Sequence, residues 1–112
     1  MARTNPPFMS GIPELFVLRL LSESEMYGYE IVSAIRSETA EAVVLGEGVI
    51  YPLLHSLEKD GRLKSRKKRV AGRERIYYRA TTSGASRLKE LFDDWQRVSR
   101  SVGLVMKPSE NT

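Results

Sequence analysis

The stretch from Gly46 to Gly61, GEGVIYPLLHSLEKDG, decides the fold. Its apolar residues recur at intervals of three and four positions: Ile50, Leu53, Leu54 and Leu57. Such spacing places them in one stripe along a helix. A second row with helical spacing lies on the other side and is polar or aromatic: Gly48, Tyr51, Pro52, His55 and Lys59. The pattern predicts a helix that buries one face and presents the other to a partner.

Pro52 restricts where this helix can begin. Proline has no N–H to donate, so it is best tolerated in the first turn, where the N–H groups have no intrahelical acceptor. We therefore expect the helix to begin close to Glu47, with Pro52 in its first turn. Gly61 is expected to end it and to let the chain turn.

The next eighteen residues, Arg62 to Arg79, carry most of the positive charge. They contain nine Lys or Arg and one acid, Glu74, which is net +8, whereas the whole chain is +4. The remaining residues therefore sum to −4. A concentrated basic segment is the electrostatic footprint expected of a protein that binds the phosphate backbone of nucleic acid. The alternative is a solvated charge run or a disordered basic arm.

The same segment changes to period-two patterning. Leu63, Ser65 and Lys67 alternate with three cations, and Ile76 and Tyr78 alternate with others further on. The sequence predicts two strands of six to eight residues joined by Val70-Ala71-Gly72-Arg73, which form a hairpin.

Two further helices are expected before the Gly46–Gly61 stretch. Pro13 fits the first turn of a helix that begins near Gly11 and runs to about Leu21, and that helix is apolar enough to be buried on most sides. A polar link over Ser22–Met26 leads to a second helix from Tyr27 to about Ala40. Ala42–Leu45 is expected to be a small strand or a packed turn. Three helices followed by a basic hairpin indicate an α+β, mostly α, winged helix-turn-helix fold spanning residues 11–81.

A long last helix is expected from Ser83 to about Met106, with Thr82 as its cap. Its apolar residues are spaced 3, 4, 3, 4 and 3 apart: Leu88, Leu91, Trp95, Val98, Val102 and Val105. That spacing is a heptad seam. A helix of this length, on the order of 35 Å, extends beyond a domain of this size. We therefore interpret residues 82–106 as a dimerisation helix; the alternative is a helix folded back on its own core.

Composition excludes several classes of protein. The chain has 112 residues, no cysteine and one histidine, so thiolate metal sites and histidine clusters are excluded, and neither a metal nor a cofactor is expected. No apolar run approaches the roughly 20 residues of a membrane span, and a cytoplasmic location is expected. The chain also lacks a Gly-rich phosphate loop and an evident catalytic cluster, so we predict no enzymatic activity. Residues 1–10 are expected to form a flexible arm, and residues 107–112 a disordered tail.

Three blocks of sequence resemble the PadR-like transcriptional repressors. They are YGYEI at Tyr27–Ile31, GVIYPLLHSLEKDG at Gly48–Gly61 and YYRATTSGASRL at Tyr77–Leu88. The ending, one helix after the hairpin, resembles the short subfamily without an extended C-terminal domain. The resemblance implies a homodimeric winged-helix repressor that binds double-stranded DNA and pairs through its first and last helices.

The resemblance also implies which residues contact DNA. They lie at the start of the second helix, on the polar row of the Gly46–Gly61 helix and on the hairpin or wing: Tyr27, Gly28, Gly48, Tyr51, Pro52, His55, Arg66, Lys67, Lys68, Arg69 and Arg73. We add Lys59 from the polar row and Arg75 from the basic segment. Tyr27 and His55 also have plain interpretations, as a packing residue and as a solvated polar residue.

A ligand site is implied around Trp95. The segment LFDDWQRV resembles the region where multidrug-sensing relatives hold planar aromatic compounds between two tryptophans at the dimer centre. Phe92 lies one turn away, and the apolar residues expected to line or fill the space are Leu15, Met9 and Phe8. The alternative is that Trp95 only packs the seam. Asp93 and Asp94 would attract cationic ligands or only face water.

The sequence therefore predicts a DNA-binding regulator whose near-palindromic operator has half-sites roughly 34 Å apart. Two alternatives remain open. The basic wing could bind an acidic protein partner instead of DNA, or the repressor could bind DNA without sensing a ligand.

Overall fold

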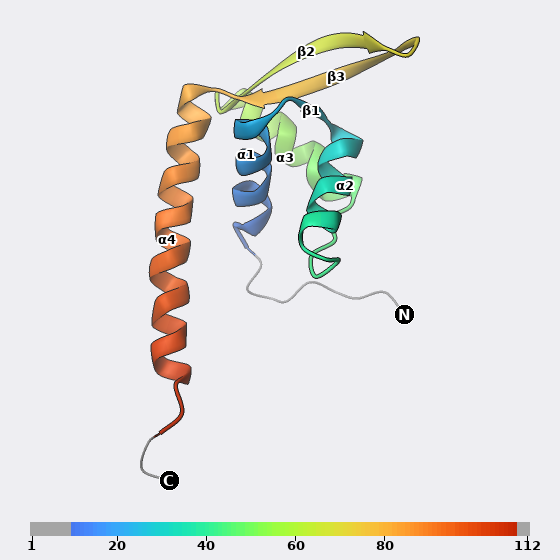
Figure 1. Cartoon of the computed structure of the whole chain (residues 1–112). Helices are drawn as coiled ribbons and strands as arrows, with labels where there is room; N and C mark the ends of the chain where they lie inside the picture. Colours follow the sequence, from blue (N-terminus) through green and yellow to red (C-terminus); the bar gives the residue numbers. More distant parts are fainter. Residues whose placement is uncertain (1–9, 110–112) are drawn as a thin grey trace.

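Four helices and a three-stranded antiparallel sheet make up the part of the chain that the computed structural model describes, residues 10–109 (Figure 1). In chain order the elements are α1 (Ile12–Glu23), β1 (Met26–Tyr27), α2 (Gly28–Glu38), α3 (Glu47–Lys59), β2 (Leu63–Val70), β3 (Arg73–Ala80) and α4 (Thr82–Met106). The sheet order is β1-β3-β2. This is the winged-helix α+β arrangement that the sequence predicts.

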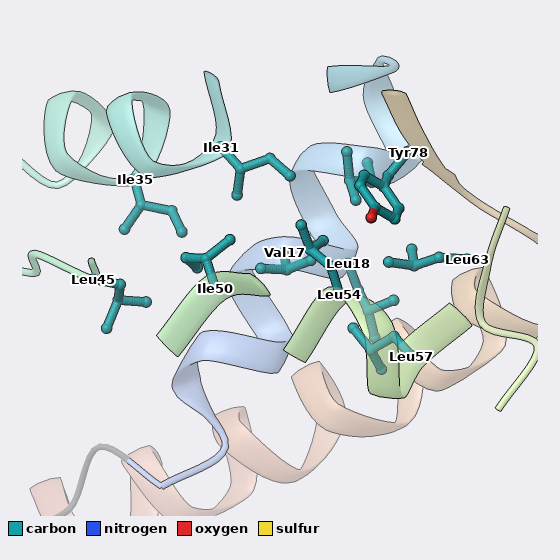
Figure 2. Close-up of a cluster of buried hydrophobic side chains, with 11 residues drawn as sticks. Val17, Leu18, Ile31, Ile35, Leu45, Ile50, Leu54, Leu57, Leu63 and Tyr78 are labelled. Carbon is teal, nitrogen blue, oxygen red and sulfur yellow. The ribbon is translucent and has the colours of Figure 1, made fainter. Parts of the chain in front are cut away.

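The core forms where α1, α2 and α3 meet under the sheet (Figure 2). The α3 stripe supplies three of its buried side chains, Ile50, Leu54 and Leu57, and α1 supplies Val17 and Leu18 among others. Leu63 and Tyr78 close the core from the sheet, and burial raises the pKa of the Tyr78 hydroxyl. The apolar stripe of α3 is therefore what joins the helices to the hairpin.

Pro52 does not lie in the first turn of α3, contrary to the expectation from sequence. The helix begins at Glu47 as predicted, but this places Pro52 sixth in the helix, in the second turn. The carbonyl four residues earlier belongs to Gly48, which is exposed, so water can satisfy the carbonyl that loses its N–H donor.

The hairpin agrees with the sequence in strand length and turn. Residues of β2 and β3 pair from Leu63↔Ala80 to Val70↔Arg73, eight on each strand. Ala71 and Gly72 both have positive φ, 52° and 78°, which a two-residue type I′ hairpin turn requires.

The link between α1 and α2 differs from the prediction. We expected Ser22–Met26 to be a polar link, but α1 continues to Glu23 and Met26–Tyr27 forms β1, which pairs with Tyr78 and Tyr77 of β3. Tyr27 therefore precedes α2 instead of beginning it, and its N–H donates to the Glu30 carboxylate (3.1 Å). A two-residue strand is too short to show a period in the sequence. Ala42–Leu45, expected to be a small strand or a packed turn, is an irregular link in which Leu45 is buried and Val44 is exposed.

The cap of α4 is Thr81 and not Thr82. The Thr81 hydroxyl accepts a hydrogen bond from the Gly84 N–H (3.1 Å) and donates one to the Gly61 carbonyl (2.7 Å). Only the tertiary fold brings Gly61 close enough for the second bond, which is why Thr81 and Thr82 were hard to separate by sequence.

The two halves of α4 have different surroundings. Leu88 and Leu91 pack against the core beside α1, and Arg87 pairs with Glu14 of α1 (3.1 Å). The helix therefore does fold back on its own domain, but only over its first half. From Trp95 onward every described residue is exposed, including Val98, Val102 and Val105.

We expect the substitution Gly84→Ala to destabilise the fold. A Cβ at this buried position would overlap the backbone carbonyl oxygen of Arg62, which cannot rotate away. Overpacking of this kind costs about 1–3 kcal/mol in the free energy of unfolding, measurable by urea denaturation.

Gly48→Ala is the matched control for Gly84→Ala. Gly48 is also helical, but a Cβ there meets no atom within 4 Å. This variant should gain about 0.5–1 kcal/mol, because alanine loses less backbone entropy than glycine on forming a helix. Equal stability of the two variants would show that α4 does not lie against Arg62 in this way.

Candidate nucleic-acid interface

An open groove of about 630 Å³ lies between the start of α2, the outer side of α3 and one edge of the hairpin. Because β1 pairs only with Tyr77 and Tyr78, the edge of β3 from residue 73 to 76 has no strand partner on that side among residues 10–109. The groove is lined by Tyr27, Gly28, Tyr29, Tyr51, His55, Arg73, Glu74, Arg75, Ile76 and Tyr78. Six residues predicted to contact DNA thus come together from four elements, β1, α2, α3 and β3: Tyr27, Gly28, Tyr51, His55, Arg73 and Arg75.

Gly28 serves a contact within the chain. It is buried, and a Cβ added to it would lie 2.5 Å from the phenol oxygen and ring of Tyr51. The Tyr51 ring occupies the space that the missing side chain leaves. Gly28 therefore positions Tyr51, whose ring centre is 6.4 Å from that of His55. The sequence did not indicate this role.

The remaining predicted residues of α3 all lie on its exposed side: Gly48, Pro52 and Lys59. No residue in the described part of the chain would meet a Cβ at Gly48. This side of α3 is therefore free for a partner.

The aromatic residues of β1 and β3 hold two wing cations in place. The Arg75 guanidinium lies 4.2 Å from the centre of the Tyr27 ring, and Lys68 Nζ lies 4.7 Å from that of Tyr77. The two rings meet edge to face at 5.3 Å. For Tyr27, packing and a place in the groove are both observed.

Glu25 is a site residue that sequence reasoning missed. Its carboxylate accepts two hydrogen bonds from Arg66, one from Nε (2.6 Å) and one from Nη2 (2.8 Å). Lys68 Nζ lies 3.4 Å from the same carboxylate. The hydrogen bond from Arg66 is the main reason why the pKa of Glu25 falls to about 2. Glu25 therefore stays ionised at neutral pH. The charge of −4 on the rest of the chain indicated that some acidic residues pair with the +8 segment. Which acid does so depends on β1, which brings Glu25 close to Arg66.

The cations near the wing tip are not held in this way. Lys67, Arg69 and Arg73 are exposed, and the structure shows no ion pair for them within residues 10–109. They can meet phosphates without breaking an internal contact.

A second, apolar region surrounds Trp95. One hollow of about 600 Å³ is lined by Leu15, Phe16, Arg19, Ala85, Leu88, Lys89, Phe92 and Trp95, and Leu15 and Trp95 also line a hollow of about 240 Å³ on the other side. Phe8 and Met9, predicted to contribute here, lie outside the described residues. Asp93 and Asp94 form exposed ion pairs with Lys89 (3.0 Å) and Arg97 (3.2 Å), so both carboxylates already have partners.

Across residues 10–109 no three His, Cys, Asp or Glu side chains gather as metal ligands. Nor does any helix in that range combine the length and apolar character needed to cross a membrane.

We expect Gly28→Ala to weaken duplex DNA binding without unfolding the protein. The added Cβ can be accommodated because the Tyr51 ring is the free end of a side chain, but the ring must leave its position beside His55. Binding measured by fluorescence anisotropy should fall several-fold, and the same substitution in a Tyr51→Ala background should have no further effect. Additive losses would show that Gly28 acts independently of Tyr51.

Comparison with known proteins identifies the family. The model of the PadR-like family of transcriptional regulators matches residues 17–90. The transcriptional regulator Rv3488 of Mycobacterium tuberculosis is 32% identical over 95 residues, which is 85% of this chain and 86% of that protein.

Two solved structures have the same fold over most of the chain. A transcriptional regulator from Clostridium thermocellum has a TM-score of 0.83 and 31% identity, covering 91% of this chain and 100% of the other. A PadR-like transcriptional regulator from Bacillus cereus has a TM-score of 0.80 and 30% identity, covering 93% and 100%. The chain thus belongs to the PadR-like family, whose members are DNA-binding transcriptional regulators and not enzymes.

Proposed function

We propose that the protein is a homodimeric repressor that reads a near-palindromic operator with α3 and the wing. The observation that carries this proposal is the groove in which Tyr51 and His55 lie next to the cations of the wing. An exposed helix face of this kind fits the major groove, and the wing cations lie beside it on the phosphates or in the minor groove. Tyr51 and His55 would set the register, and the cations would supply most of the affinity.

Dimerisation is supported by the second half of α4. Its exposed apolar residues continue the seam beyond the end of the domain: Trp95 (42% exposed), Val98 (50%), Val102 (55%) and Val105 (82%). An apolar row of this length on a soluble helix favours a partner with the same heptad spacing. The seam of a second copy provides it. Two α3 helices held by this pairing would meet half-sites about one helical turn apart, roughly 34 Å.

Ligand sensing is supported by the hollows on both sides of Trp95. The larger hollow is mainly apolar and presents Phe92 and Trp95, which suits a planar aromatic ligand. In a dimer the two Trp95 rings would approach one another across the seam. A ligand between them could relieve repression only by binding one angle between the subunits better than the other. A repressor that senses no ligand is the alternative, in which Trp95 packs against its copy.

The DNA proposal is tested by the salt dependence of binding to random duplex. Each lost phosphate contact should reduce the slope of log K against log salt by about 0.9. We therefore expect the double variant Lys67→Gln/Arg69→Gln to lower the slope by about 1.8. Arg36→Gln is the control, because Arg36 pairs with Glu41 at the far end of α2 (3.1 Å) and should leave the slope unchanged.

If the wild-type protein failed to bind duplex at low salt, the DNA proposal would be wrong. Retained binding to an acidic polypeptide in the same assay would then favour the protein-partner alternative.

The dimer and the ligand site are tested with variants of α4. In analytical ultracentrifugation the wild-type chain should sediment as a dimer at micromolar concentration and Val102→Glu as a monomer, because the new carboxylate would lie in the apolar seam. Planar cationic dyes should quench the fluorescence of Trp95, the only tryptophan. Full dye affinity in Trp95→Ala, measured by dye anisotropy, would rule out the sandwich.

A further inference from the structure

The hairpin has two faces of different chemistry. Side chains alternate along a strand, and cross-strand partners share a face. One face, the inner face, carries Leu63, Ser65 and Tyr78; Leu63 and Tyr78 are buried in the core, and Ser65 donates a hydrogen bond to Glu58 of α3. Lys67 and Arg69 continue the inner face toward the tip, on the same side of the sheet as α3.

The other face, the outer face, is almost entirely cationic. It carries Lys64, Arg66, Lys68, Val70, Arg73, Arg75, Tyr77 and Arg79. Two of its cross-strand pairs bring like charges directly opposite one another, Lys64↔Arg79 and Lys68↔Arg75. Like charges in this arrangement destabilise a sheet. The free protein therefore keeps an outer face that lowers its own stability.

Only part of this repulsion is offset within the chain. Lys68 forms an ion pair with Glu25, and the Arg75 guanidinium lies over the Tyr27 ring. For Lys64 and Arg79 the structure shows neither an ion pair nor a ring contact among residues 10–109. Both side chains are exposed and line two adjoining shallow hollows at the root of the wing, of about 500 and 490 Å³. Lys64↔Arg79 is therefore the like-charge pair of the outer face that no contact within residues 10–109 offsets.

DNA bound along α3 would not contact the Lys64–Arg79 pair. The pair lies at the root of the hairpin, on the side of the sheet opposite α3, whereas Lys67 and Arg69 lie toward the tip on the α3 side. A single straight stretch of duplex along α3 and the inner face would not reach it.

We propose that the outer face, through Lys64 and Arg79, binds the phosphate backbone of a second segment of double-stranded DNA. This inference rests on the proposed DNA-binding function and extends it. The eight-residue hairpin is about 26 Å long, and duplex DNA carries one charge per roughly 1.7 Å of axis, so the face spans many phosphates.

The composition of the outer face favours DNA over a protein partner. Apart from Val70 at the tip, it exposes no apolar side chain, because Tyr77 is only 7% exposed. Protein–protein interfaces need an apolar or aromatic centre, whereas protein–DNA interfaces are polar and strongly positive. Binding a second segment would let one repressor hold two stretches of duplex together.

The test counts duplexes bound per chain. Fluorescent random duplexes of about 12 base pairs are titrated into protein held well above the dissociation constant in low salt. We expect two duplexes per wild-type chain and one per chain for Lys64→Gln/Arg79→Gln. Lys67→Gln/Arg69→Gln, which weakens the α3 site without removing it, should still bind two. Arg36→Gln, the control, should retain two.

A stability measurement provides an independent readout for the same variant. Removing the Lys64–Arg79 repulsion should raise the Tm of Lys64→Gln/Arg79→Gln at low salt, and the difference should shrink at high salt. This result would show that the variant is folded and that any lost duplex is not a consequence of unfolding.

The outcomes separate this inference from the function on which it rests. One duplex per wild-type chain, or two per chain in Lys64→Gln/Arg79→Gln, overturns the outer-face site while leaving α3 binding intact. Absence of any bound duplex overturns the proposed function itself. Displacement of only the second duplex by poly-glutamate, at a lower concentration than competing duplex requires, would overturn DNA as the occupant in favour of an acidic protein.

Discussion

The anchoring of the sheet onto the helices is the constraint on which the functional surfaces depend. Tyr78 on β3 and Leu63 on β2 enter the same core as Leu54 and Leu57 of α3. Because side chains alternate along each strand, burying these two residues determines which way every other hairpin residue points. The burial of Leu63 and Tyr78 thus places Lys67 and Arg69 on the α3 side of the sheet. It places Lys64 and Arg79 on the opposite side.

The helix α4 is longer than the domain it packs against, and this difference leaves its second half exposed. The domain covers the helix only as far as Leu91, and the 25-residue helix continues well beyond that point (Figure 1). The heptad spacing of apolar residues continues past Leu91, from Trp95 to Val105, where the helix no longer packs against the core. In the proposed dimer, one half of α4 would lie on its own domain and the other half on its copy. A change of pairing at Trp95 would then be passed to α1, which packs beside the first half.

Charge on the wing is divided between held and free cations. Glu25, just before β1, and Tyr27, within it, engage Arg66, Lys68 and Arg75, whereas Lys67 and Arg69 have no ion pair within residues 10–109. The held cations tie the middle of the hairpin to β1 and its neighbour Glu25. The free ones contribute charge that can be neutralised by phosphate without first breaking an internal contact. A basic segment that reads as uniform in the sequence therefore has at least two physical roles.

The sequence by itself determined the elements whose signals are local. The α3 stripe, the Ala71-Gly72 turn and the heptad spacing of α4 follow from side-chain period and backbone preference, which need no knowledge of distant residues. Tertiary structure alone decided the features that join distant segments: β1 against β3, the Thr81 hydroxyl on Gly61, Tyr51 over Gly28 and Glu25 on Arg66. Pro52 belongs with these, since its place in the second turn is tolerated only because Gly48 is exposed in the folded chain. Each of the first four is a contact between residues far apart in the chain, and such a contact leaves no periodic trace in the sequence.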